Sequence, residues 1–301
     1  MNAESVKARL KNVAVETGRT FQDLLGTYGM ERTLYRLSVS EYREKFTLKG
    51  GIFLYALYDG DYPRATTDID LLAKGIGNDI ETIETVFAHI FSITTDDPLK
   101  FDLESLEVKA ITEFKEYHGV NVSIIAFLDR TRIPISIDIG FGDVIYPDRV
   151  LMDFPVLVSE DAPEVYAYSL YSSIAEKFEA MVSLGYDNSR FKDFYDIYVN
   201  AQKYDFDGQT LVAAIKETFG HRGTSLHTIV AFGAEYSNDA IRLSRWKSFV
   251  KKKKVSLDVT LPDTIEAIKR FLIPVTEAIA TGESFDAKWD SREQQWNDNC
   301  Q

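Results

Sequence analysis

Two acidic residues in one short stretch of the sequence have the spacing of a metal site. Asp68 and Asp70 stand two positions apart, and apolar residues flank Asp70 on both sides. Residues two apart on a β-strand point to the same face of its sheet, so a strand here would hold both carboxylates side by side. Oxygen ligands of this kind suit Mg²⁺, whose coordination is completed by substrate phosphates and water. The spacing predicts a site for one or two magnesium ions.

A pair of glycines precedes the acids. Gly50 and Gly51 follow Lys49, and an apolar segment begins at Ile52. Glycines let a turn expose its backbone N–H groups, and a helix that starts there offers those groups and its positive dipole end to phosphate. A phosphate-binding turn followed by a pair of metal ligands is what nucleotidyl transfer needs. Taken alone, a glycine pair is commonly only a turn, and an acid pair is commonly solvated.

A third carboxylate lies on a predicted strand over residues 133–141. Isoleucines alternate there with small or polar residues, and Asp138 is the only acid on the polar face. One face of such a strand is buried, and an acid among small neighbours leaves room for a ligand. If this strand lies beside the strand of Asp68 and Asp70, the three carboxylates converge, and Asp138 completes the metal site or accepts the proton of the attacking hydroxyl. The alternative is a solvated or turn-capping acid.

Charged side chains also mark two predicted helices in the second half of the chain. Lys177 lies at the edge of an apolar stripe, where it is either a lysine whose stem packs against the stripe or a cation directed at a triphosphate. Lys192, Asp193 and Asp196 share one flank of the next helix. Lys192 and Asp196 are four residues apart and could form a simple ion pair.

A basic segment from Arg242 to Lys254 contains seven cations and no acid in thirteen residues. It contrasts with a net charge of −13 and a pI of about 4.9, which argue against broad nonspecific binding of nucleic acid. The segment is either an amphipathic helix anchored by Trp246 and Phe249, or a local surface for RNA phosphates. The candidate RNA-binding residues are Arg242, Arg245, Lys247, Lys251 and Lys252.

Composition describes an ordinary globular protein. The 301 residues are 45% hydrophobic and 27% charged, which suffices for one large or two ordinary domains. The polar first residues predict no signal peptide, and the lack of a long apolar run predicts no membrane span. The only cysteine is Cys300, which excludes an internal disulfide and favours a cytoplasmic protein.

The pattern of elements predicts an α/β (α+β) domain over residues 1–155 and a helical domain over residues 156–301. Apolar periodicity predicts helices at 4–16, 20–45, 77–91, 166–184, 190–204, 208–219, 236–251 and 263–280. Alternation predicts strands at 106–114, 120–128 and 133–141. The tail after residue 282 is expected to be partly loose.

The order of these motifs resembles the nucleotidyltransferase signature, which is a glycine pair, a spacer and then Asp-x-Asp on a strand. The sixteen-residue spacer, 52–67, is long for that superfamily but is similar to that of the AbiEii/AbiGii-type toxins. That family also has an arginine and a hydroxyl residue before the acids, and Arg64 with Thr66 or Thr67 fills those places. The resemblance implies that Arg64 and Thr67 bind the nucleotide.

The resemblance extends beyond the acids. Residues 28–51 are similar to the start of the family, and Lys177 with residues 188–196 is similar to its later motifs, so the likeness covers roughly residues 20–255. It implies a polymerase-beta-like mixed-sheet domain followed by a helical domain. It also implies that Lys177 contacts phosphates and that Asp196 is a catalytic acid, with Asp193 as the competing candidate and Lys192 assisting.

The resemblance also implies partners and a biological role. Such proteins are toxins of toxin–antitoxin pairs linked to phage defence, and they attach nucleotides from a nucleoside triphosphate to an acceptor, in some cases the 3′ end of tRNA. A cognate antitoxin encoded nearby and magnesium as cofactor follow from it. Two other classes stay open from the residues: nucleotidyl or glycosyl transfer to a small molecule or protein, and a nucleotide-binding protein without chemistry.

Overall fold

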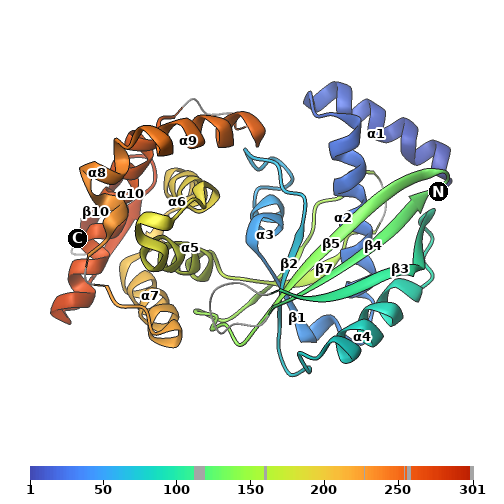
Figure 1. Ribbon diagram of the computed structural model, residues 1–301, viewed down its shortest axis with the longest axis horizontal. Helices are drawn as coiled ribbons and strands as arrows, with labels where there is room; N and C mark the ends of the chain where they lie inside the picture. Colours follow the sequence, from blue (N-terminus) through green and yellow to red (C-terminus); the bar gives the residue numbers. More distant parts are fainter. Residues whose placement is uncertain (112–118, 159–160, 227, 254, 256–258, 299–301) are drawn as a thin grey trace. The chain divides into compact units, whose positions relative to one another are not determined.

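The computed structural model describes residues 1–301 except 112–118, 159–160, 227, 254, 256–258 and 299–301 (Figure 1). The chain divides into two compact units. The first unit comprises Met1–Tyr62, Thr66–Asp143 and Arg149–Tyr168, and the second comprises Pro63–Ala65, Val144–Asp148 and Ser169–Gln301. The first unit extends beyond the change of character that the sequence shows near residue 155, because two short strands up to residue 167 join its sheet.

The first unit contains a mixed seven-stranded sheet of order β3-β4-β5-β2-β1-β7-β6. Its strands are β1 (Phe46–Lys49), β2 (Ile69–Ala73), β3 (Leu99–Ile111), β4 (Gly119–Leu128), β5 (Thr131–Phe141), β6 (Val150–Asp153) and β7 (Glu164–Ala167). β2 runs parallel to β5 and β1 parallel to β7, whereas the other neighbours are antiparallel. The mixed sheet and the many helices confirm the predicted fold class.

Alternation in β5 positions the polar residues of that strand. Ile133, Ile135, Ile137 and Ile139 are each at most 2% exposed. The residues between them therefore lie on the opposite face of the sheet, as the period of two requires. Asp138 is one of these residues and is half-buried.

The α-helices among the described residues of the first unit are α1 (Ala3–Thr17), α2 (Phe21–Ser38), α3 (Gly50–Leu57) and α4 (Ile80–Ser92). Helix α2 lies close against β5, and a Cβ at Gly29 would be 2.6 Å from Cδ1 of Ile135. The prediction of one helix over residues 20–45 was wrong beyond Ser38. The hydroxyl of Ser40 bonds to the carbonyl of Leu37 and accepts from the backbone N–H of Tyr42, so it competes with continuation of the helix.

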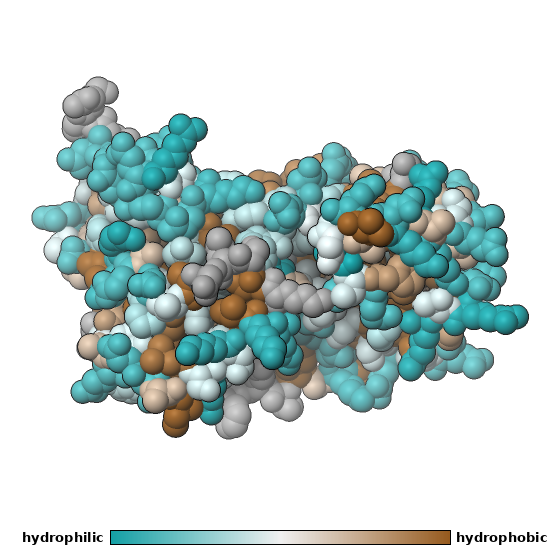
Figure 2. Space-filling view, turned by 90° about the horizontal axis from the view of Figure 1, so that it is seen from above, coloured by the Kyte–Doolittle hydropathy of each residue, from teal (hydrophilic) through white to brown (hydrophobic). Residues whose placement is uncertain are grey.

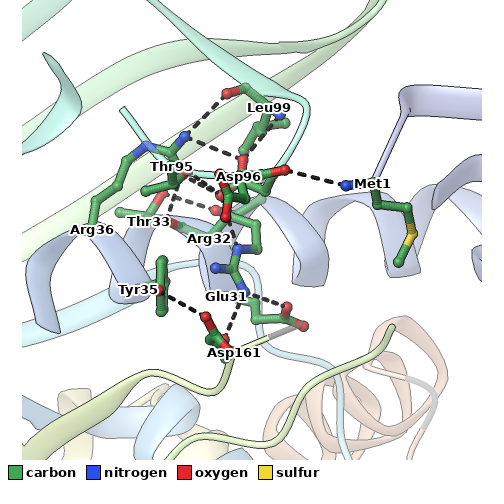
Figure 3. Close-up of polar contacts among 12 residues, drawn as sticks. Met1, Glu31, Arg32, Thr33, Tyr35, Arg36, Thr95, Asp96, Leu99 and Asp161 are labelled. Carbon is green, nitrogen blue, oxygen red and sulfur yellow. Dashed lines mark hydrogen bonds and ion pairs between the residues drawn. The ribbon is translucent and has the colours of Figure 1, made fainter. Parts of the chain in front are cut away.

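A buried ionic network anchors α2 within the first unit (Figure 3). Arg36 donates to both carboxylate oxygens of Asp97 at 2.9 and 3.2 Å, and Arg32 donates to Asp97 at 3.1 Å. Glu31 accepts from the backbone N–H of Leu157 at 2.8 Å. Burial alone would raise the pKa of Asp97, but the two guanidinium groups and its hydrogen bonds outweigh burial and lower it. The network is a structural anchor for α2.

The second unit is mainly helical. Its α-helices are α5 (Leu170–Leu184), α6 (Phe191–Lys203), α7 (Gly208–Arg222), α8 (Ala234–Ser237), α9 (Ala240–Lys252) and α10 (Leu261–Thr281). Helix α5 begins four residues later than the sequence predicted, because the Ser169 hydroxyl caps it by accepting from the N–H of Ser172 and the residues before it form β7.

The tail was expected to be partly loose, but its described part contains two strands up to Asp298. A small sheet of order β10-β9-β8 joins β8 (Phe206–Asp207), β9 (Ala287–Asp290) and β10 (Gln295–Asp298). Trp289 is 1% exposed and donates its indole N–H to the carbonyl of Ala201 at 2.7 Å. Trp296 stacks on Phe271 of α10. Burial of two large aromatic side chains outweighs the polar composition of this segment. Cys300 lies outside the described residues.

The surface is mainly hydrophilic, in agreement with the ordinary globular composition of the chain. Figure 2 shows one face of the molecule, where hydrophilic residues cover most of the surface and hydrophobic residues form small separate groups. Among the described residues, no helix is both long and apolar enough to cross a membrane.

Candidate active site

Four polar side chains form a row across neighbouring strands of the first unit. Asn121 of β4 is in register with Asp138 of β5, which is in register with Asp70 of β2. Asp70 is in turn in register with Lys49 of β1. Residues in register on adjacent strands point to the same face of a sheet, so two carboxylates lie next to each other between an amide and an ammonium group. All four residues are half-buried. We call this set the polar row.

The Asp138 side chain is held by a neutral donor. Nδ2 of Asn121 donates to Oδ1 of Asp138 at 2.6 Å and to Oγ of Ser136 at 2.9 Å. A carboxylate can only accept, so the amide nitrogen must face it. Sequence reasoning missed Asn121, because an asparagine at a polar position of a strand has no distinguishing signal until the strand register sets it opposite Asp138.

The turn at Gly50 brings the start of α3 against Asp70. Gly50 has φ +66°, in the left-handed region that favours glycine. A Cβ at this position would lie 1.9 Å from Oδ2 and 2.4 Å from Cγ of Asp70. The turn therefore needs glycine for its conformation and for its lack of a side chain. The predicted phosphate-binding turn and one predicted metal carboxylate thus occupy the same place in the first unit.

Two other residues of the predicted phosphate turn flank Gly50. The ammonium group of Lys49 donates to Oδ2 of Asp143 at 2.7 Å and lies 5.4 Å from the ring centre of Tyr168. Gly51 is buried in the first turn of α3. Lys49 is thus tied to a loop that follows β5.

Asp68 differs from Asp70 in its surroundings. It lies just before β2, is exposed, and accepts a hydrogen bond from the hydroxyl of Thr67 at 3.0 Å. Within the described ranges, no three His, Cys, Asp or Glu side chains are grouped so that they could hold a metal ion by themselves. The structure therefore pairs Asp70 with Asp138 but does not assemble all three predicted ligands into one preformed site.

A second cluster of charged residues lies inside the second unit, and we call it the buried charge cluster. It comprises the buried residues Arg64, Lys177, Asp193 and Asp196, together with Arg190, which is exposed and reaches Asp193 from the surface. Arg64 donates from Nε and Nη2 to the two oxygens of Asp196, each at 2.6 Å. Nζ of Lys177 lies 2.9 Å from Oδ2 of Asp196 and 3.6 Å from Oδ1 of Asp193. Arg190 donates to Oδ2 of Asp193 at 2.7 Å.

Lys177 and the two acids of this cluster are almost fully buried. Lys177 is 8% exposed, and Asp193 and Asp196 are fully buried. Burial alone would lower the pKa of Lys177, but Asp196 and Asp193 together outweigh it and raise the pKa, so Lys177 stays protonated. Burial alone would likewise raise the pKa of Asp196, but Arg64 and Lys177 lower it. Asp196 is therefore ionised at neutral pH.

The cluster separates alternatives that the sequence left open. Lys177 is a buried ion-pair partner rather than a lysine that packs its stem under an exposed ammonium group. Lys192 is exposed, and Asp196 is bound by Arg64 and Lys177. Asp193 has a buried Oδ1 that makes no hydrogen bond, 3.6 Å from Lys177. Asp196 thus accepts hydrogen bonds through both carboxylate oxygens, whereas Asp193 accepts one through Oδ2.

Helix α9 carries the predicted RNA-binding residues. Arg242 is committed to local structure, because its guanidinium group lies 4.4 Å from the ring centre of Tyr236 and 3.2 Å from Asp239. The exposed candidates are Arg245, Lys247, Lys251 and Lys252. Trp246 is 2% exposed and anchors the helix by donating to the carbonyl of Val259 at 2.8 Å. Lys254 lies outside the described residues.

Solved structures show a related fold. A candidate nucleotidyltransferase from Helicobacter pylori covers 88% of this chain and 100% of its own, with a TM-score of 0.52 and 14% sequence identity. A second Helicobacter pylori structure, of JHP933, covers 87% of this chain and 95% of its own, with a TM-score of 0.49 and 12% identity. No curated protein matches the sequence.

The family assignment rests on the sequence itself. The model of the AbiEii family, described as nucleotidyl transferase toxins of a type IV toxin–antitoxin system, matches residues 32–291. This range contains every residue of the polar row and of the buried charge cluster. It confirms the resemblance drawn from the glycine pair, the acid pair and the later helical motifs. The chain therefore belongs to the AbiEii family of toxin–antitoxin nucleotidyltransferases.

Proposed function

We propose that this toxin transfers a nucleotide from a nucleoside triphosphate to an RNA acceptor, such as the 3′ end of tRNA, in a magnesium-dependent reaction. The acceptor hydroxyl attacks the α-phosphorus, a new P–O bond forms, and the bond to pyrophosphate breaks. The observation that carries the proposal is the in-register pair Asp70 and Asp138 beside the glycine turn at Gly50. Phosphate and metal chemistry need these two features in one place.

The donor set of the polar row fits magnesium. Mg²⁺ in phosphate-transfer sites is bound by one or two carboxylates together with substrate phosphate oxygens, so a preformed group of three carboxylates is not required. Asp70 and Asp138 would hold the ion, and Asp68 is proposed as a further ligand once a triphosphate is present. Bound there, magnesium neutralises the negative charge of the phosphate oxygens.

The chain's own residues bind and orient the triphosphate. The N–H groups at Gly50 and Gly51 and the hydroxyl of Thr67 are proposed to contact its phosphates, because a helix start attracts anions. Lys49 is proposed to exchange Asp143 for a phosphate oxygen, since its ammonium group is a mobile point charge on a flexible stem.

For Lys177 of the buried charge cluster we propose the phosphate-contacting role that the family resemblance implies. Its ammonium group lies beside the carboxylates of Asp193 and Asp196, which also bind Arg190 and Arg64. Lys177, held protonated, would offset the charge that builds on pyrophosphate.

The lowered pKa of Asp196 bears on its proposed role. A carboxylate with a lowered pKa accepts a proton poorly. We therefore propose that Asp196 holds Lys177 and Arg64 in place. The role of a proton acceptor then falls to Asp138 or Asp193, and the exposed Lys192 assists the acceptor.

The exposed cations of α9 support an RNA acceptor. They form a local positive surface on a protein whose net charge is −13. A nucleotidyltransferase toxin acting on RNA would work in the cytoplasm, would be held in check by the antitoxin of its pair, and would stop translation when freed, as phage defence requires.

The decisive experiment mixes the protein with magnesium, each α-³²P-labelled nucleoside triphosphate in turn, and total cellular RNA. We expect one nucleotide to label RNA of tRNA size, and EDTA to abolish the labelling. A control without RNA separates transfer from hydrolysis. Label found in protein or in a small molecule would refute the RNA acceptor, and absence of any magnesium-dependent triphosphate consumption would refute the enzymatic proposal.

Removing cations from α9 tests the acceptor separately. Replacing Lys251 and Lys252 with alanine should raise the KM for RNA and reduce the slope of log KM against log salt by about 1 for each phosphate that a lysine no longer neutralises. The KM for the nucleoside triphosphate should not change. The matched control replaces Lys216 and Lys288, two exposed lysines elsewhere in the second unit, and removes the same charge. Equal effects of the two double variants would contradict a specific RNA surface on α9.

A further inference from the structure

We propose that Asn121 is a positioning residue that orients Asp138 for metal binding. The inference rests on the proposed function and deepens it. The supporting observations are the register of Asn121 with Asp138 and the 2.6 Å hydrogen bond between Nδ2 and Oδ1. The donor in this hydrogen bond is a neutral amide group, and Asn121 lies in none of the motifs that the sequence showed.

The geometry fixes the Asp138 carboxylate at one oxygen. Asn121 has two N–H donors on Nδ2 and uses them for Asp138 and for the hydroxyl of Ser136. With both donors in use, the amide group is held in one orientation, and Oδ1 of Asp138 is held with it. The second oxygen, Oδ2, is left to bind a cation. Ligating carboxylates commonly have such hydrogen-bonded supports, which set the orientation of the ligand.

The neutrality of the donor is as important as its position. In the buried charge cluster, Asp196 faces two cations, and its charge is compensated. An arginine or lysine at position 121 would compensate Asp138 in the same way and compete with a metal ion. An amide holds the Asp138 carboxylate without adding a positive charge beside it, so the amide does not compete with a divalent cation for that carboxylate. This contrast explains why an amide occupies the end of the polar row beside Asp138.

The test uses two variants of the full chain, Asn121→Ala and Asn121→Leu, with Ser123→Ala as matched control. Ser123 lies on the same strand two residues on, on the same face, and is in register with Ser136. Circular dichroism checks folding. Mn²⁺ binding is measured by electron paramagnetic resonance with an α,β-methylene nucleoside triphosphate present, and pyrophosphate release is measured against magnesium concentration.

We expect Asn121→Ala to weaken Mn²⁺ binding by about 10- to 100-fold, as for other supports of metal ligands. Its activity should recover at high magnesium concentration. Asn121→Leu has the same branched shape as asparagine but no N–H donor, so it should weaken Mn²⁺ binding to a similar extent. Should the alanine variant fail to fold, the similarly shaped leucine variant still carries the test through its Mn²⁺ affinity.

Three outcomes would overturn the inference. They are unchanged Mn²⁺ affinity in folded Asn121→Ala, unchanged Mn²⁺ affinity in folded Asn121→Leu, and equal effects in Ser123→Ala. Failure of the proposed function looks different. In that case the unaltered protein consumes no nucleoside triphosphate with any RNA, whether or not it binds Mn²⁺.

Discussion

Replacing Asp70 with asparagine is expected to lower nucleotidyl transfer by on the order of 10³-fold or more, because a metal ligand stabilises the transition state by several kcal/mol. Asparagine has nearly the same volume but no negative charge, so the loss reports charge rather than packing. The neighbouring Asp138 then faces no like charge in register, and we expect the first unit to stay folded. The measurement is single-turnover transfer of labelled nucleotide at saturating triphosphate.

The control for this prediction is Asp153→Asn, which removes an exposed carboxylate from β6 of the same unit. It should leave activity unchanged. Circular dichroism spectra and melting curves of both variants should overlay those of the unaltered protein. Full transfer activity in a folded Asp70→Asn variant would end the metal assignment of the polar row.

Replacing Asp196 with alanine is expected to destabilise the second unit by about 3–5 kcal/mol, the usual cost of removing one partner from a buried ion pair. The change leaves Arg64 and Lys177 buried, with their cationic groups deprived of the carboxylate that binds both. Activity should fall with it, because Lys177 loses the partner that fixes its position. The measurement is urea denaturation of the variant and the unaltered protein.

Tryptophan fluorescence makes this measurement specific for the second unit. The three tryptophans of the chain are at positions 246, 289 and 296, all within that unit. The matched control is Lys192→Ala, an exposed change one turn earlier on α6, which should shift stability by no more than about 0.5 kcal/mol. A midpoint for Asp196→Ala equal to that of the control would show that the buried pair does not hold the unit together.

Three strands of the polar row, β2, β4 and β5, could be predicted because their local pattern agrees with their burial, whereas β1 was not predicted. The isoleucines of residues 133–139 alternate strictly, and this alternation alone places Asp138 on the face away from the buried isoleucines. The glycine pair likewise predicted the turn at Gly50. What sequence could not supply is register. Whether Asp138 lies opposite Asp70 depends on which strands are neighbours, and that is decided by packing of the whole sheet.

Other features of the site could not be predicted because they depend on contacts with residues far away in the sequence. Arg64 has the position of a phosphate-binding residue in sequence, yet its guanidinium group binds Asp196, 132 positions later. Asn121 acquires its role only from the strand beside it. The polar composition after residue 282 predicts a partly loose segment, although Trp289 and Trp296 both donate indole hydrogen bonds to distant carbonyl groups. In each case a long-range contact outweighs local propensity.

The three residues Pro63–Ala65 belong to the second unit, while the chain on both sides of them belongs to the first. No single cut in the gene can therefore release either unit whole. A fragment that stops at Tyr168 would contain Arg64 stripped of its carboxylate, and one that starts at Ser169 would leave Asp196 without its guanidinium partner. Chimeras made with homologous toxins must exchange this short insertion together with the helices that receive it.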